Sequence, residues 1–297
     1  MTRMWSLPAT LVVANSTVVI LLLAAGSAAP VAQDGTAVAV NVPQLVESSL
    51  AATRRHWQER ALYSYSTRVE NRRRDMEGHL KSQDVETLTT MLIDDVPFER
   101  LVARNGQPPS AREERRQTNA LDELKHETPA QRTQRLREDN AETASLIEEV
   151  PKAFDFHVVG QEVVHGRAAY VLHITPRAGY EPRGTYGKVF SKVEGTLWID
   201  TQNLVWIKVD GHVIEPFSIG LFLVRLLRGS QVTMEQTRAD DGTWLPAHIE
   251  VRAAAKILLL KSVVIEREST YSGYRRAGAD AASTRAFRHA GNEKSGE

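Results

Sequence analysis

The sequence contains no cysteine, and this absence excludes disulfides, thiolate metal sites, a cysteine nucleophile and a lipid-modified N-terminal cysteine. It also has no surplus of one charge, because 37 Lys and Arg residues balance 37 Asp and Glu residues. A protein that binds nucleic acid normally carries excess positive charge, since contacts with phosphates supply most of its affinity. We therefore expect no nucleic acid among the partners.

Recognisable catalytic motifs are missing as well. Neither Gly-x-Ser-x-Gly nor His-Glu-x-x-His occurs in the chain, and no close acid–base pair is readable. We therefore predict a protein that is not an enzyme and uses no cofactor.

Three histidines, His157, His165 and His173, are spaced eight apart across a predicted hairpin. A turn centred on His165 would place His157 opposite His173, in metal-ligand geometry. A two-residue turn at His165-Gly166 would instead shift the pairing by one residue and separate them. Because no third ligand is evident, we predict no metal site.

The first 32 residues resemble a Sec-type signal peptide. Arg3 is their only charge, residues 11–25 are mostly apolar, and the small residues at 26–29 suit a cleavage site. The alternative is a retained anchor, although residues 15–17 (NST) interrupt the apolar run before the roughly 18 residues that a span prefers. Either way we expect a periplasmic or otherwise exported protein. Residues 33–41 are predicted to be a flexible leader and residues 273–297 a disordered tail.

Residues 189–270 show the period of two that is typical of a sheet with one dry and one wet face. In the run 189–200 one face carries Val189, Val193, Leu197 and Ile199, and the other carries Lys192, Glu194, Thr196 and Asp200. In the next run Val205, Ile207 and Val209 alternate with Lys208, Asp210 and His212. Turn residues separate these runs, so we predict antiparallel hairpins.

The N-terminal half predicts a helix, three strands and then a helical insertion. Asn41 and Pro43 begin an amphipathic helix that carries Trp57 and ends near residue 60, followed by strands at 63–70, 85–93 and 98–104. The insertion spans 108–150, with two capping boxes and helices at about 110–127 and 129–149. It is either a charged surface excursion or a movable lid over the sheet.

Two further segments allow more than one interpretation. Residues 72–74 are three consecutive arginines, which form either a solvated hairpin tip or a binding site for phosphate or lipid head groups. Residues 216–229 are apolar and predict a short helix that Ser218 caps and Gly229 ends. That helix would fill the core, line an apolar cavity or contact a membrane.

The order of elements, together with the segments 63–68 (YSYSTR), 195–200 (GTLWID), 204–208 (LVWIK) and 241–246 (DGTWLP), resembles the periplasmic carriers that sort outer-membrane lipoproteins, the LolA/LolB-like family. The resemblance implies an α+β fold in which a strongly curved antiparallel sheet forms an incomplete β-barrel and helices cover its concave face. It also implies one domain over residues 42–272 and reversible holding of acyl chains. The large insertion departs from the family, and no family functional residue maps onto this sequence.

These observations predict an exported, non-enzymatic carrier or binding protein for a lipid, an acyl chain or another apolar ligand, with lipoprotein sorting as one role. The alternative is a cell-envelope interaction or assembly module with a filled core, in which the 217–227 segment meets envelope proteins or the membrane surface. The residues expected to line the apolar cavity are Trp57, Leu197, Ile199, Val205, Ile207, Phe217, Leu221 and Phe222.

Overall fold

The computed structural model describes residues 40–93, 96–182, 184–219, 224–257 and 261–277. The helices are α3 (Val42–Glu59), the 3-10 turn η2 (Arg60–Leu62), α4 (Ala111–His126), α5 (Pro129–Ala153) and α6 (Gly184–Phe190). The strands are β1 (Tyr63–Arg74), β2 (Leu80–Ile93), β3 (Val96–Arg104), β4 (Phe154–Val164), β5 (Arg167–Pro176), β6 (Val193–Asp200), β7 (Trp206–Val213), β8 (Phe217–Ile219), β9 (Val224–Leu226), β10 (Gln231–Arg238), β11 (Trp244–Ile257) and β12 (Lys261–Arg276).

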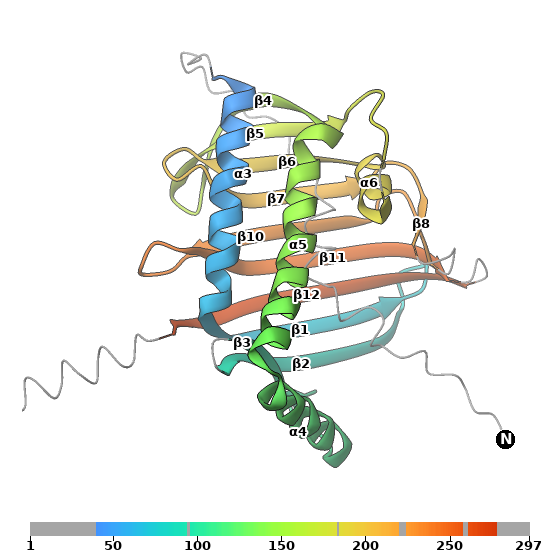
Figure 1. Ribbon diagram of the computed structural model, residues 1–297. Coiled ribbons are helices and arrows are strands. Elements are labelled where there is room, and N and C mark those ends of the chain that lie inside the picture. The colour runs from blue at the N-terminus through green and yellow to red at the C-terminus, as the bar shows by residue number, and fades with distance from the viewer. Residues whose placement is uncertain (1–39, 94–95, 183, 220–223, 258–260, 278–297) are drawn as a thin grey trace, which may run out of the picture.

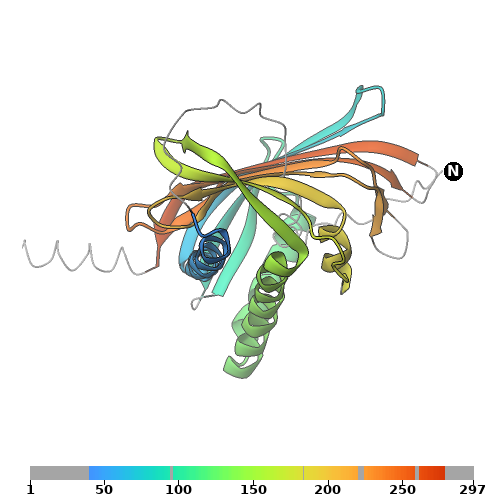
Figure 2. The ribbon, with the colours of Figure 1, turned by 90° about the horizontal axis from the view of Figure 1, so that it is seen from above.

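All twelve strands belong to one antiparallel sheet. Ten of them follow the order β3-β2-β1-β12-β11-β10-β7-β6-β5-β4, and the short β8–β9 hairpin joins through β11. The sheet bends without closing into a barrel, and α3 and α5 run across its concave face (Figures 1 and 2). The expected α+β fold, a strongly curved antiparallel sheet covered by helices, is therefore confirmed.

The helix starts follow the capping chemistry of the sequence. The Asn41 side chain accepts a hydrogen bond from the Gln44 backbone N–H at 3.2 Å and caps α3. Full capping boxes begin α4, with Ser110 and Glu113, and α5, with Thr128 and Gln131. Each box satisfies backbone N–H groups that the first helical turn leaves without partners.

The β4–β5 hairpin combines parts of both alternatives left open by the sequence. Its turn is the two-residue His165-Gly166, with φ values of 49° and 79°, and Val164 pairs with Arg167. A bulge between Val158 and Gly160 then shifts the register by one, so that His157 nevertheless lies opposite His173. A bulge adds one residue to one strand only, which is why the period of two could not locate this pairing.

Four boundaries differ from the expectation. Val189 lies in α6 instead of a strand, and β6 begins only at Val193. The described parts of 216–229 form β8 and β9 instead of a helix, because their backbones pair with each other and with β11. The expected tail from 273 onward is ordered as far as Arg276 in β12, which pairs with β1. The charged region at 72–74 is strand up to Arg74, not a turn.

The helical insertion is only partly a surface excursion. In α4 Leu124 is the one buried residue, as a solvent-facing helix predicts. The end of α5 is different, because Ile147, Val150 and Ala153 pack into the main core. Within the part of the chain that the structure describes, no helix combines the length and apolar character needed to cross a membrane. The predicted signal peptide lies outside the described residues.

Candidate functional site

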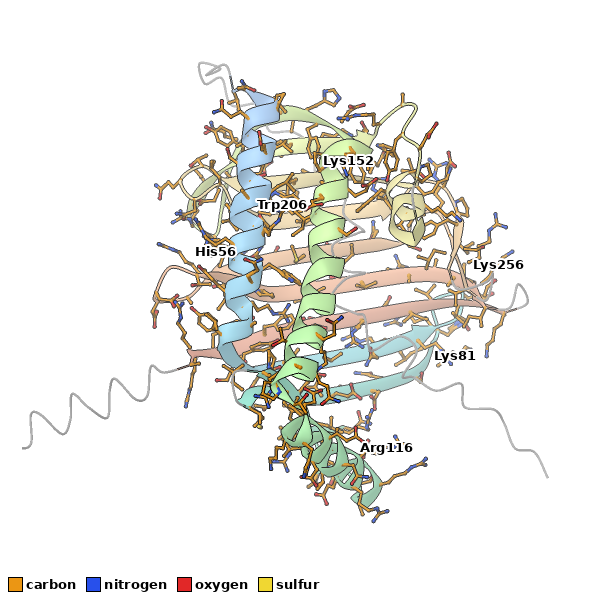
Figure 3. The ribbon with its side chains drawn as sticks, viewed as in Figure 1. His56, Lys81, Arg116, Lys152, Trp206 and Lys256 are labelled. Carbon is orange, nitrogen blue, oxygen red and sulfur yellow. The ribbon has the colours of Figure 1, made fainter. Side chains whose placement is uncertain are left out.

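One half of the concave face is filled by the main apolar core. Side chains of α3, α5 and α6 meet those of β4 to β7 and β10 there, including Leu50, Ile147, Phe190, Leu197 and Val232. The indole of Trp206 also enters this core beneath α3, and its Nε1–H donates to Ser49 Oγ at 3.0 Å (Figure 3). Such packing holds the helices against the sheet.

The residues predicted to line a cavity lie in different places. Leu197 and Ile199 are 2% and 0% exposed inside the main core. Val205 and Ile207 are equally buried but belong to a second cluster with Trp198 and Trp244. Trp57 on α3 is half-buried, and the Arg60 guanidinium lies 5.2 Å from its ring centroid.

Phe217 on β8 is half-buried at the edge of the main core. Leu221 and Phe222 lie outside the described residues.

A bulge explains why Ile207 left the face on which the sequence placed it. Trp198 pairs with Lys208 and Ile199 pairs with Trp206, which leaves Ile207 as the extra residue. Trp206 therefore joins the core beside Leu197 and Ile199, although the period of two placed it on the wet face. Sequence reasoning missed Trp206 for this reason.

Asp200, also expected on the wet face, is completely buried. Arg167 donates to both of its carboxylate oxygens, Nε to Oδ2 at 2.6 Å and Nη2 to Oδ1 at 2.9 Å. Burial raises the pKa of Asp200, but these bonds and the backbone N–H of Asn203 outweigh it and hold the pKa below its usual range.

The other half of the concave face carries half-buried apolar side chains, which we call the distal patch. Its members are Phe217, Val224, Val251, Ala253, Ile257 and Ile265. They pack beside three buried side chains of the same face, Leu226, Ala255 and Val263. The ends of β11 and β12 that carry the patch extend beyond α5, next to β8 (Figure 1). This apolar sheet surface adjoins the main core through Phe217 and Val251 and continues beyond it.

Two arginines adjoin the distal patch on the same face. Arg73 is the cross-strand partner of Ile265, which in turn pairs with Ala253, and cross-strand partners point to the same side of a sheet. Arg267 follows two residues after Ile265 and donates to Asn71 Oδ1 at 3.3 Å. Its buried Nε has no hydrogen-bond partner within the described chain.

The arginine triplet is thus divided between the two faces of the sheet. Arg72 pairs with Glu70 at 2.5 Å and Arg74 pairs with Glu266 at 2.9 Å on the convex face. The hydrogen bond from Arg68 and the contacts of Arg72 lower the pKa of Glu70. For Arg73, no carboxylate of a described residue lies within ion-pair distance, so it is the arginine available to a ligand.

A polar and aromatic cluster lies near the end of α3, where β1 begins and β12 ends. The Arg60 guanidinium lies within 5.2–5.7 Å of the rings of Trp57, Tyr65 and Tyr271. Burial alone lowers the pKa of Arg60, but the neighbouring phenols raise it overall, so the guanidinium stays charged. Burial raises the pKa of Tyr271 and Tyr274. The cluster is a cation–π contact that the protein satisfies internally.

One group of side chains within the described residues has the spacing of metal ligands: Asp75, Glu77 and His79 in the β1–β2 turn. Lys81 already binds Asp75 at 2.7 Å, and this contact is the main cause of the lowered pKa of Asp75. His79 also contacts the same carboxylate. The group is an exposed ion-pair network, and His157 and His173 do not belong to it.

The fold defines an α+β protein with a curved, incomplete barrel. No family model matches the sequence, and no curated protein matches it. Among solved structures the chain is similar to a DUF1329 family protein from Desulfovibrio piger, with 10% identity over 79% of this chain and 94% of that one and a TM-score of 0.30.

It is also similar to a LolA superfamily protein from Nitrosomonas europaea, with 13% identity over 80% of this chain and 94% of that one and a TM-score of 0.27. A third similar structure is the MucA/MucB complex of Pseudomonas aeruginosa, with 11% identity over 80% of this chain and 99% of that one and a TM-score of 0.22. The expected resemblance to LolA-like proteins is therefore present but weak. At these values it carries no ligand or partner over to this chain.

Proposed function

We propose that the protein is an exported, non-enzymatic binding protein that holds an acyl chain, or another apolar ligand, on the distal patch. The observation that carries the proposal is the contrast between the filled main core and the half-buried apolar side chains of the patch. A ligand that covered them would gain about 0.8 kcal/mol for each CH₂ group removed from water. Apolar burial needs no strict geometry, which suits a carrier.

The proposal moves the ligand away from most of the residues that the sequence selected. Leu197 and Ile199 are fully enclosed by protein side chains, so a ligand would reach them only by displacing α3 or α5. Among the described residues of that set, Phe217 is the one with a place in the patch. We assign Leu197 and Ile199 to stability and Phe217 to binding.

Arg73 and Arg267 favour a ligand that also carries an anionic group. Both lie at the β1 side of the patch, and an arginine binds carboxylate or phosphate oxygens with paired N–H donors. An amphipathic ligand would place its acyl chain on Ile265 and Ala253 and its anionic group toward Arg73. We therefore expect anionic lipids to bind more tightly than zwitterionic ones.

The test is native mass spectrometry of the mature protein purified from an envelope fraction, followed by lipid extraction. We expect co-purified acyl lipid in the wild type and its loss in Ile265→Glu, which puts a charge in the patch. Val163→Glu is the matched control, because Val163 is 74% exposed on β4. Added palmitoyl-lysophosphatidylglycerol should bind more tightly than palmitoyl-lysophosphatidylcholine, and Arg73→Gln should remove the difference.

A clean protein mass, with no shift on adding either lipid, would overturn the proposal. The filled main core would then favour the alternative, an interaction or assembly module of the cell envelope. Equal loss of lipid in Ile265→Glu and Val163→Glu would also count against the patch, because it would indicate non-specific binding.

A further inference from the structure

A second candidate site lies at the end of the sheet that carries the tip of the β4–β5 hairpin and the β10–β11 turn. A cavity of about 410 Å³ opens there between the tip of the β4–β5 hairpin, β7, the end of β10 and the start of β11. Its wall includes Val164, Arg167, Ile207, Arg238, Trp244 and Ala247. Its volume falls within the range of roughly 300–1,000 Å³ that is usual for small-ligand sites.

The base of this cavity is apolar and firmly held. Ile207 and Trp244 are 1% and 4% exposed and pack together in the second cluster. The bulge in β7 places Ile207 in this second cluster. The Trp244 backbone N–H donates to His56 Nδ1 at 3.3 Å, which ties the start of β11 to α3. Since both side chains are fixed by packing, they give the cavity a rigid base, and the half-buried Val164 and Ala247 are the apolar side chains that its wall exposes.

Trp244 also brings a hydrogen-bond donor that the protein leaves unused. Its Nε1 is buried and has no partner within the part of the chain that the structure describes. A buried donor without a partner destabilises the folded state, and nearly all such groups in proteins are satisfied. An acceptor supplied by a ligand would remove this cost.

The charges around the cavity favour an anionic acceptor. Arg238 is exposed, its Nε–H donates weakly to the Gly242 carbonyl at 3.4 Å, and the structure places no carboxylate of a described residue within ion-pair distance of it. Arg167 lies over the Trp244 ring, 5.4 Å from its centroid.

Glu235 is the carboxylate in the cavity wall, and it is already engaged by Lys208 at 3.2 Å and His165 at 3.2 Å. The positive charge of Arg238 therefore has no counterpart in the wall.

We propose that this cavity binds an apolar group that carries a carboxylate. The apolar part would pack on the half-buried Val164 and Ala247, and the carboxylate would accept hydrogen bonds from Trp244 Nε1–H and Arg238. A free medium-chain carboxylate and the carboxyl-terminal residue of a peptide share this chemistry. The site is distinct from the distal patch, which lies on the concave face.

The experiment is an NMR titration of the ¹⁵N-labelled protein in which the indole N–H signals are observed. Octanoate should move the Trp244 Nε1–H signal downfield and saturate it, because the proton gains an acceptor. Octanol and octylamine, which have the same chain without the anion, should bind at least about tenfold more weakly. Tripeptides that end in phenylalanine, as free acid or as amide, distinguish a peptide end from a free carboxylate.

Two variants keep the test decisive. Arg238→Gln changes an exposed side chain that is expected to leave the fold intact, and it should weaken octanoate binding about tenfold. Arg115→Gln on the exposed helix α4 is the control and should have no effect. No movement of the Trp244 signal, or equal binding of octanoate and octanol, would overturn the proposal and indicate a hydrated cavity only. The lipid result for Ile265→Glu is independent of either outcome.

Discussion

The two halves of the sheet use apolar and charged residues in opposite ways. On β4 to β7 and β10 the concave face is a filled core, and the buried Asp200 carboxylate forms an ion pair with Arg167. On β11, β12 and β1 the concave face keeps a half-buried patch, while the convex face carries a network of partly exposed ion pairs around Glu70 and Glu266.

The difference separates stability from binding. Side chains that are enclosed on all sides hold the fold together and are not available to a ligand. Side chains that remain half-buried contribute less to folding, and their uncovered area is what a ligand can remove from water. Substitutions that treat the two halves alike should therefore have unequal effects.

The largest effect is expected for Trp206→Ala. This change empties a buried site beneath α3 and removes the hydrogen bond to Ser49, and it should lower the free energy of unfolding by about 3–5 kcal/mol. Ile265→Ala in the distal patch should cost about 1 kcal/mol, because its side chain is already partly in water. Urea unfolding followed by circular dichroism measures both. Equal costs would contradict the division into core and patch.

A smaller effect is expected from the ion pairs. Arg167→Gln leaves the buried Asp200 carboxylate without its strongest partner and should cost about 2 kcal/mol. Arg72→Gln removes one partner of the buried Glu70 carboxylate, which keeps Arg68 and Gln83, and should cost less than about 1 kcal/mol. The same unfolding measurement compares them. A larger loss for Arg72→Gln would show that the convex network acts cooperatively.

The smallest effect concerns pH. Burial lowers the pKa of His56, which the attraction of Glu59 only partly offsets, so the folded state favours the neutral ring (Figure 3). Its contribution to stability is present above the unfolded pKa of about 6.5 and is lost as pH falls through the folded value. The melting temperature should drop less between pH 7.5 and pH 5 in His56→Gln than in the wild type.

His126→Gln is the control for this measurement, because the His126 side chain is exposed on α4 and contacts the Asp122 backbone carbonyl instead of a carboxylate. An identical decline in His56→Gln and the wild type would show that His56 does not contribute to the pH dependence of stability.

Local chemistry in the sequence predicted much of the fold. Asn41, Ser110 and Thr128 marked the starts of helices because their side chains satisfy free backbone N–H groups. The alternation of apolar and polar residues located most strands, and the resemblance to LolA/LolB-like proteins implied the curved antiparallel sheet. The prediction of a helix at 216–229 was wrong, because apolar residues alone do not distinguish a helix from strands that pair with β11.

The sequence alone determined most of the helices and strands, since capping and periodicity depend on residues only a few positions apart. The tertiary structure decided which apolar residues are enclosed and which remain available. One bulge places Ile207 in the second cluster and Trp206 in the main core, and strand pairing sets Arg73 beside Ile265. The physical reason is that a shift of one residue reverses the face of every side chain beyond it, and only long-range pairing fixes that shift.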